Sequence, residues 1–240
     1  MGVVLRLGDF LLNSLQGTIF TPAHRIVPMN ILGKISANLA TRFDGSPTVL
    51  PLPDDAPAEF PRLIFKSKDE QWELQLASAR LNYRWSQRAE TQQVSVQEFS
   101  GEFLSFLENF LKIENPRIGR MAVVLSRYLL IPEPATLLSR HFCKEVWLKN
   151  AMSNPRSFEL HSHKRTKIGN TFEVNEWIRF KTGQLTFPNT PKRPILIVEH
   201  DVNTLPEQTS TAAYSVEDLK NFLAAAQDEM DSCLKVFLEA

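Results

Sequence analysis

Residues 61–85 read PRLIFKSKDEQWELQLASARLNYRW, and their alternation of apolar and polar side chains decides the expected fold. The apolar members recur at every second position within each run, at Leu63, Phe65, Trp72, Leu74, Leu76, Leu81, Tyr83 and Trp85. A period of two indicates strands with one buried and one solvated face, which antiparallel sheets allow and doubly covered parallel sheets do not. The connecting segments 68–71 and 77–79 are short enough for tight hairpins, so we predict a three-stranded meander.

Two segments carry a strong helical pattern. In residues 96–111 apolar side chains recur at spacings of three and four, behind a capping box of Ser95 and Glu98. The stripe consists of Phe99, Phe103, Phe106, Leu107 and Phe110. Residues 216–238 keep a similar stripe to the end of the chain. We therefore predict an α+β protein with an antiparallel sheet, or sheets, and long helices packed on one face.

The other elements follow from weaker patterns. Further strands are expected at residues 16–21, 117–131, 158–163, 171–181 and 195–199, and shorter helices at 29–42 and 134–144. Proline-rich or polar composition predicts connecting segments at 48–61, 150–155, 183–194 and 199–213, the last of them mobile.

The predicted order of elements occurs twice. Residues 1–114 contain a strand, a helix, three strands and a long helix, and residues 115–240 contain the same succession. The residues themselves do not repeat, so this prediction of an internal duplication depends on the order of elements alone. The two halves are expected either as separate α+β units or as one integrated domain.

The charge balance and the cysteines limit the classes of protein to which this chain can belong. The chain has 240 residues, 43% of them hydrophobic, and 27 Lys and Arg against 27 Asp and Glu. A net charge of zero argues against a dedicated nucleic-acid-binding protein, which needs a basic excess to release counterions. Cys143 and Cys233 show no CxxC spacing and are expected as buried, reduced thiols in a reducing cytosol. The apolar N-terminal run is interrupted by Arg6 and Asp9, so we predict a cytoplasmic protein without membrane association.

No complete catalytic signature is present in the sequence, so no catalytic residue and no cofactor is assigned. In a strand, His161 and His163 point to the same face, and His200 follows a strand that could lie nearby. A metal-dependent hydrolase or nuclease at these histidines is therefore one alternative. The other interpretation is an exposed polar strand face, which the following Lys164 and Arg165 favour because they oppose a dication. Whether the protein is an enzyme stays open.

Polar residues on the predicted strands are candidates for binding. The expected binding residues are Arg80, Asn82, Arg84, Arg127, Tyr128, His161 and His163. Arginines with interleaved aromatic residues could also bind nucleic acid by stacking on bases, which is a further alternative. The zero net charge favours a protein partner over nucleic acid.

Short motifs in three places carry a family resemblance. The first is the strand with Gln75-Leu76, followed by Asn82 and Trp85. The second is the pair Arg127-Tyr128, and the third is the last predicted strand, residues 195–201, with the C-terminal helix that ends at Phe237. With them the chain resembles an uncharacterised family of prokaryotic proteins of similar length that is distributed sporadically across bacteria and archaea. The resemblance covers residues 60–140 and 195–238. Family members usually follow the Arg-Tyr pair with an apolar residue and an asparagine, where this chain has Leu129-Leu130.

The resemblance implies no known activity. Its patchy distribution implies genes that move between genomes, as defence, toxin–antitoxin and phage-related genes do. We therefore expect a non-enzymatic binding protein, a neutralising or sensing component of a mobile or defence-type locus, with a protein partner encoded nearby. A homo-oligomer is also compatible with the sequence.

Overall fold

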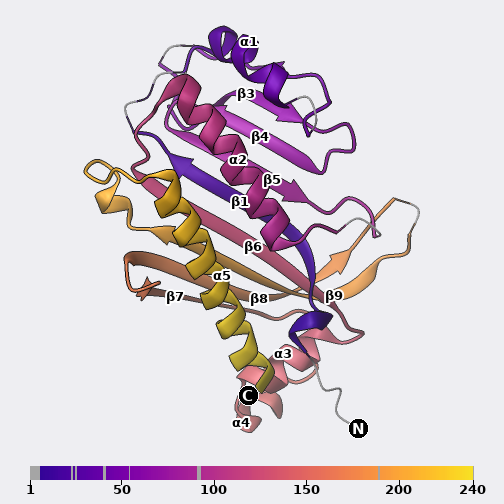
Figure 1. Cartoon of the computed structure of the whole chain (residues 1–240). Helices are drawn as coiled ribbons and strands as arrows, with labels where there is room; N and C mark the ends of the chain where they lie inside the picture. The colour runs from indigo at the N-terminus through magenta and orange to yellow at the C-terminus, as the bar shows by residue number, and fades with distance from the viewer. Residues whose placement is uncertain are drawn as a thin grey trace.

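The computed structural model describes residues 6–22, 24, 26–39, 42–53, 55–90, 93–188 and 190–239, without the side chains of residues 36–39. The fold is α+β, built on a nine-stranded sheet in the order β2-β3-β4-β5-β1-β6-β9-β8-β7 (Figure 1). Every pair of neighbouring strands is antiparallel. The strands are β1 (Leu11–Phe20), β2 (Thr48–Val49), β3 (Pro61–Lys66), β4 (Trp72–Ala77), β5 (Arg80–Ser86), β6 (Arg120–Leu130), β7 (Glu159–Ile168), β8 (Phe172–Leu185) and β9 (Arg193–Thr204).

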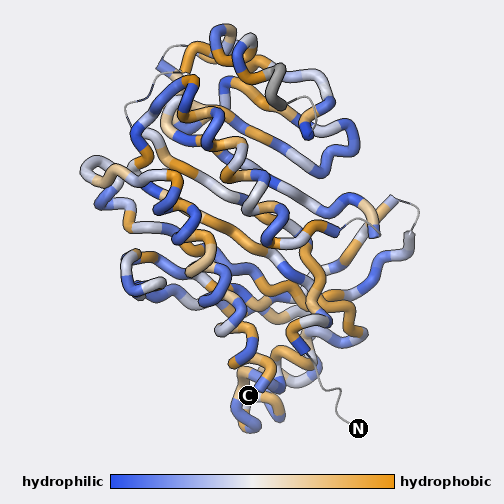
Figure 2. The backbone as a smooth tube through the Cα atoms, in the orientation of Figure 1, coloured by the Kyte–Doolittle hydropathy of each residue, from blue (hydrophilic) through white to orange (hydrophobic). Residues whose placement is uncertain are grey.

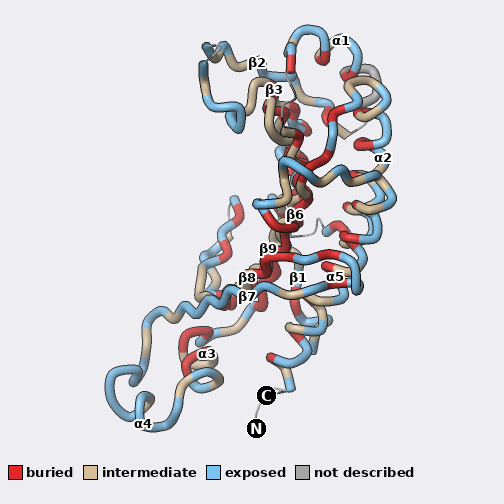
Figure 3. Tube along the Cα trace, turned by 90° about the vertical axis from the view of Figure 1, so that its left-hand side faces the viewer, coloured by how far each residue is buried: buried red, intermediate tan, exposed pale blue. Residues whose placement is uncertain are grey.

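The helices lie mainly on one side of the sheet. They are α1 (Pro28–Leu39), α2 (Val96–Glu114), α3 (Pro134–Phe142), α4 (Glu145–Leu148) and α5 (Val216–Glu239), with short 3-10 turns η1 (Leu7–Asp9) and η2 (Pro206–Gln208). Figure 3 shows α1, α2 and α5 along the same side of the strands. Hydrophilic residues are interspersed along α2 and α5 (Figure 2), as expected of helices that bury one side only.

The predicted meander is confirmed, since β3, β4 and β5 are consecutive neighbours in the sheet. Its alternating apolar side chains are buried in the main core together with the phenylalanine stripe of α2. Tyr83 lies at the centre of this contact, with its ring centroid 5.7, 5.5 and 5.7 Å from those of Phe99, Phe103 and Phe106. The α2 helix begins as predicted, because the Ser95 hydroxyl accepts a hydrogen bond from the backbone N–H of Glu98.

A second apolar cluster lies towards the C-terminal end of α5. Leu138 of α3 packs there with Phe180 and Val198 of the sheet and with Leu234 and Phe237 of α5. The main core and this cluster both lie against the same nine-stranded sheet, so the two predicted halves share one sheet.

The connections between the later strands differ from the sequence prediction. Residues 183–194 were expected as a loop, but β8 runs to Leu185 and β9 starts at Arg193. Residues 199–213 were expected to be mobile, but β9 continues to Thr204, because Val198, His200 and Val202 are buried at alternate positions. The short helix α4 was not predicted. None of the described helices combines the length and apolarity needed to cross a membrane.

Candidate binding surface on the open face of the sheet

The side of the sheet opposite α2 and α5 carries mostly polar side chains. Neighbouring residues along a strand point to opposite faces of the sheet, so every second residue of each strand lies on this side. We call this surface the open face and define it by Gln16, Thr18, Glu73, Gln75, Asn82, Arg84, Ser126, Arg179, Lys181, Glu199, Asp201 and Asn203. Figure 3 shows no helix over this face along the middle strands.

A chain of hydrogen bonds crosses the open face from β4 to β1. The Asn82 amide donates to Gln75 Oε1 over 3.2 Å, and the Thr18 hydroxyl donates to Asn82 Oδ1 over 2.9 Å. The Gln16 amide in turn donates to the Thr18 hydroxyl over 3.1 Å. Amides and hydroxyls therefore line the middle of the surface, where each can both donate and accept.

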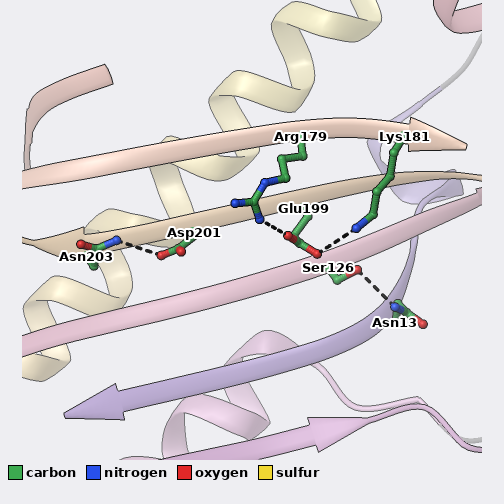
Figure 4. Close-up of polar contacts among 7 residues, drawn as sticks. All are labelled: Asn13, Ser126, Arg179, Lys181, Glu199, Asp201 and Asn203. Atoms are coloured by element: carbon green, nitrogen blue, oxygen red, sulfur yellow. Dashed lines mark hydrogen bonds and ion pairs between the residues drawn. The ribbon is translucent and has the colours of Figure 1, made fainter. Parts of the chain in front are cut away.

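Charged side chains occupy the neighbouring strands β9 and β8. Glu199 lies between two cations, with Oε1 2.5 Å from Arg179 Nη1 and Oε2 3.4 Å from Lys181 Nζ (Figure 4). Burial by itself would raise the pKa of Glu199, but Arg179 and Lys181 outweigh it and lower the pKa, so the carboxylate stays ionised. Next to it, the Asn203 amide donates to Asp201 Oδ1 over 2.9 Å.

The surface continues across β6 and onto the edge strand β7. The Asn13 amide donates to the Ser126 hydroxyl over 3.2 Å (Figure 4). At the edge, the exposed His163 ring stacks on Trp177, with ring centroids 4.2 Å apart and an interplanar angle of 14°. His161 is also exposed, and its ring centroid lies 6.5 Å from that of Trp177. Both histidines therefore belong to the accessible part of the open face.

The structure places the predicted binding residues unevenly. Arg80, Asn82 and Arg84 alternate on β5 opposite to the core residues of that strand, so they lie on the open face. Arg84 is exposed, whereas Asn82 is only 8% exposed because its amide is held between Gln75 and Thr18. Arg84 is therefore the predicted arginine best placed to contact a partner.

Arg127 is not on the open face. It alternates with Ser126 and Tyr128 on β6 and points under α5, where its guanidinium pairs with Asp231. It is 7% exposed, so its interaction is internal to the fold. Arg127 and Tyr128 were both predicted as binding residues, but adjacent residues in a strand face opposite sides, so they cannot belong to one surface.

Tyr128 does point away from α5, but it is covered. Its side chain packs with Leu185, Phe187 and Ile195 of the hairpin between β8 and β9 and is 1% exposed. Burial raises the pKa of Tyr128. The sequence could not reveal this cover, because it depends on how the hairpin folds back over the sheet.

The three histidines of the predicted metal site are not brought together. His161 and His163 lie on the open face, across from Arg179 and Trp177 in the β7–β8 ladder. His200 pairs with Ile178 and Leu125 and points under α5, where it is 1% exposed. The described residues form no group of three metal-ligating side chains on the open face.

Sequence reasoning missed the charged part of this surface. Glu199, Asp201 and Asn203 alternate with buried Val198, His200 and Val202, which is the pattern that identified the meander. The alternation in residues 198–203 therefore predicts a strand, but the polar composition of residues 199–213 led to the prediction of a mobile segment instead. Elsewhere on the sheet, too, cations pair with carboxylates, as Lys66 does with Glu73 over 3.2 Å and Arg165 with Glu207 over 2.7 Å.

Comparison with known proteins adds no family to these observations. No protein-family model matches the sequence, and no curated protein matches it at a significant level. The family resemblance carried by the sequence motifs therefore stays a prediction.

Proposed function

We propose that this chain is a non-catalytic binding protein that holds a protein partner on the open face of its sheet. One observation carries the proposal: along its middle strands, one face of the sheet bears hydrogen-bonding and charged side chains and has no helix over it (Figure 3). The opposite face is filled by α2 and α5, so it has no comparable surface to offer.

The charge pattern of the open face favours protein over nucleic acid. Two of its cations, Arg179 and Lys181, already pair with the carboxylate of Glu199. A phosphate backbone would meet Glu199 and Asp201 as like charges, and it would have to displace an existing ion pair to reach Arg179. A protein surface with mixed charges can instead match this alternation.

The ion pairs of Glu199 with Arg179 and Lys181 also argue against a catalytic role for the open-face carboxylates. A general base near neutral pH needs a pKa close to the working pH, whereas Arg179 and Lys181 lower the pKa of Glu199. Asp201 accepts a hydrogen bond from Asn203, and no hydroxyl or thiol group among the described residues donates to either carboxylate. The geometry is that of a recognition surface with its side chains held in place by their neighbours.

The proposal includes a cytoplasmic location and a protein partner encoded near this chain. Cys143 and Cys233 are free thiols, which fits a reducing compartment such as the cytoplasm, although both are only partly buried rather than buried as expected. The sequence resemblance to a sporadically distributed family supports a partner encoded nearby, in a mobile or defence-type locus. In such a locus the protein would neutralise or sense its partner.

We also propose that the two halves of the chain arose by duplication. Outward from the central β1–β6 pair, the sheet order is β5, β4, β3 on one side and β9, β8, β7 on the other. When the two-residue edge strand β2 is left out, each run lists the fourth, third and second strand of its half. Superposing β1, β5, β4 and α2 on β6, β9, β8 and α5 tests this proposal. Coincident helices with non-coincident strands would contradict it.

Site-specific photo-crosslinking tests the proposed function. A photoreactive residue is placed at Arg84 or Lys181 on the open face and, as matched controls, at exposed Lys112 of α2 or Lys220 of α5. In the native host, both open-face positions should capture the same protein and both controls should not. The purified partner should then bind the Arg84→Glu variant at least about tenfold more weakly, because a contact charge is reversed. Equal capture from the helix positions, or unchanged affinity, would overturn the proposal.

A further inference from the structure

A group of buried ionisable side chains lies between the sheet and α5, on the face opposite the proposed binding surface. Glu176 of β8 and His200 of β9 are each 1% exposed, and Cys233 of α5 faces them. Their potential ligand atoms all lie within 4.8 Å of one another. These residues are far apart in the sequence and are brought together only by the pairing of β8 with β9 and the packing of α5.

Two polar atoms of this group lack a partner. His200 Nε2 and Glu176 Oε1 are buried without a hydrogen-bond partner. The other carboxylate oxygen, Glu176 Oε2, forms an ion pair with Lys164 Nζ over 3.0 Å. Buried atoms of this kind normally find a partner, because leaving one unpaired costs about 1–3 kcal/mol.

We propose that Glu176, His200 and Cys233 form a binding site for a divalent transition metal, with zinc as the best match. One carboxylate, one imidazole and one thiol are the three ligand types that zinc accepts in proteins. Around tetrahedral zinc, ligand atoms lie roughly 3.3–3.8 Å apart, as bond lengths of about 2.0–2.3 Å require. At the upper limit of 4.8 Å the ligand atoms need to approach one another by about 1–1.5 Å, which is within reach of side-chain rotation.

The surrounding charges leave room for an added cation. Lys164 pairs with both Glu176 and Glu229, and Arg127 pairs with Asp231. Three carboxyl groups, of Glu176, Glu229 and Asp231, therefore share two cationic partners. Glu229 precedes Cys233 by one helical turn on the same side of α5, and it reaches the site through its ion pair with Lys164.

Lys164 is the group that a metal must displace. Its ammonium is bound by Glu229 over 2.9 Å as well as by Glu176, and its side chain is 52% exposed on the edge strand β7. The Lys164 side chain can therefore turn away from Glu176, either keeping its ion pair with Glu229 or pointing into solvent.

Cobalt(II) binding to the full-length protein, with any affinity tag removed, tests the site. A cysteine ligand gives a thiolate-to-cobalt charge-transfer band in the near ultraviolet, and a tetrahedral site gives intense visible bands. We expect about one cobalt per chain, displaced by zinc, with the charge-transfer band lost in Cys233→Ser. Cys143→Ser and the double variant His161→Ala/His163→Ala should keep the full spectrum, since these residues lie elsewhere.

Two further measurements keep the test decisive if Cys233→Ser fails to fold. In the unaltered protein, zinc should protect Cys233 from alkylation by iodoacetamide while Cys143 still reacts, as read by peptide mass spectrometry. Lys164→Met should bind zinc about tenfold more tightly, because a competing cation is removed, whereas Lys167→Met on the same strand should not. Substoichiometric metal, a spectrum without the thiolate band, or equal alkylation of both cysteines would overturn the proposal.

Discussion

Phe103 of α2 lies directly on Gly17 of β1, so closely that a Cβ atom on Gly17 would be 2.3 Å from a ring carbon of Phe103. No side chain fits between them, so the glycine sets how near α2 approaches the middle of the sheet. Phe103 is fully buried and its ring centroid is 5.5 Å from that of Tyr83. The close approach therefore seats the aromatic stripe of α2 in the core.

Replacing Gly17 with alanine should destabilise the protein. The added methyl group would push Phe103 out of its position, and overpacking of this kind costs about 1–3 kcal/mol. Urea unfolding followed by tryptophan fluorescence gives the free energy of unfolding. The matched control is Gly101→Ala in α2, where nothing lies within 4 Å and alanine should stabilise the helix by about 1 kcal/mol. Equal effects of the two changes would contradict this assignment.

The ion pair between Arg127 and Asp231 should be structural. Asp231→Asn leaves the buried guanidinium without its counter-charge, and we expect a loss of about 2–4 kcal/mol in the free energy of unfolding. The double variant Arg127→Met/Asp231→Leu should recover most of this loss, because it removes both charges and keeps the volume. A double-mutant cycle measures the coupling, and coupling near zero would show that the pair contributes nothing.

The hairpin between β3 and β4 should respond to acid through Asp69. Burial by itself would raise the pKa of Asp69, but hydrogen bonds from Ser67 and Gln71 outweigh it and lower the pKa below its ordinary 3.8. A lowered pKa in the folded state stabilises the fold above the unfolded pKa, and this stabilisation is lost as the pH falls below about 4. Gln71 links the carboxylate to the core, since Trp85 Nε1 donates to its Oε1 over 3.1 Å.

Asp69→Asn should therefore lower stability at neutral pH by less than about 1 kcal/mol, because the hairpin is solvent-exposed. The difference between the two proteins should shrink as the pH approaches 3. Urea unfolding at a series of pH values measures it. A difference that stays constant over the acid range would mean that the charge of Asp69 plays no part.

The carboxylates of the open face should exclude nucleic acid. The unaltered protein is expected not to bind a single-stranded oligonucleotide even at low salt, whereas Glu199→Gln/Asp201→Asn should bind it weakly. The substitution frees Arg179 and Lys181 from their counter-charge and makes the surface more positive. Fluorescence polarisation across a salt series measures the binding. Tight binding by the unaltered protein would favour nucleic acid over a protein partner.

Local patterns in the sequence determined the meander of residues 61–85, the two long helices and the α+β class. Each of these depends on side-chain periodicity within one segment, and a segment with one buried face carries that period in its own residues. The alternation of Arg80, Asn82 and Arg84 placed them correctly opposite to the core. The continuation of β9 to Thr204 had the same signal and could have been found.

The tertiary structure alone decided which residues meet. Strand order set Glu199 beside Arg179 and Lys181, the β8–β9 hairpin covered Tyr128, and α5 brought Asp231 to Arg127. His200 was separated from His161 and His163 and placed with Glu176 and Cys233 instead. The physical reason is that periodicity tells which face of its own strand a residue occupies, but not which strand or helix will face it.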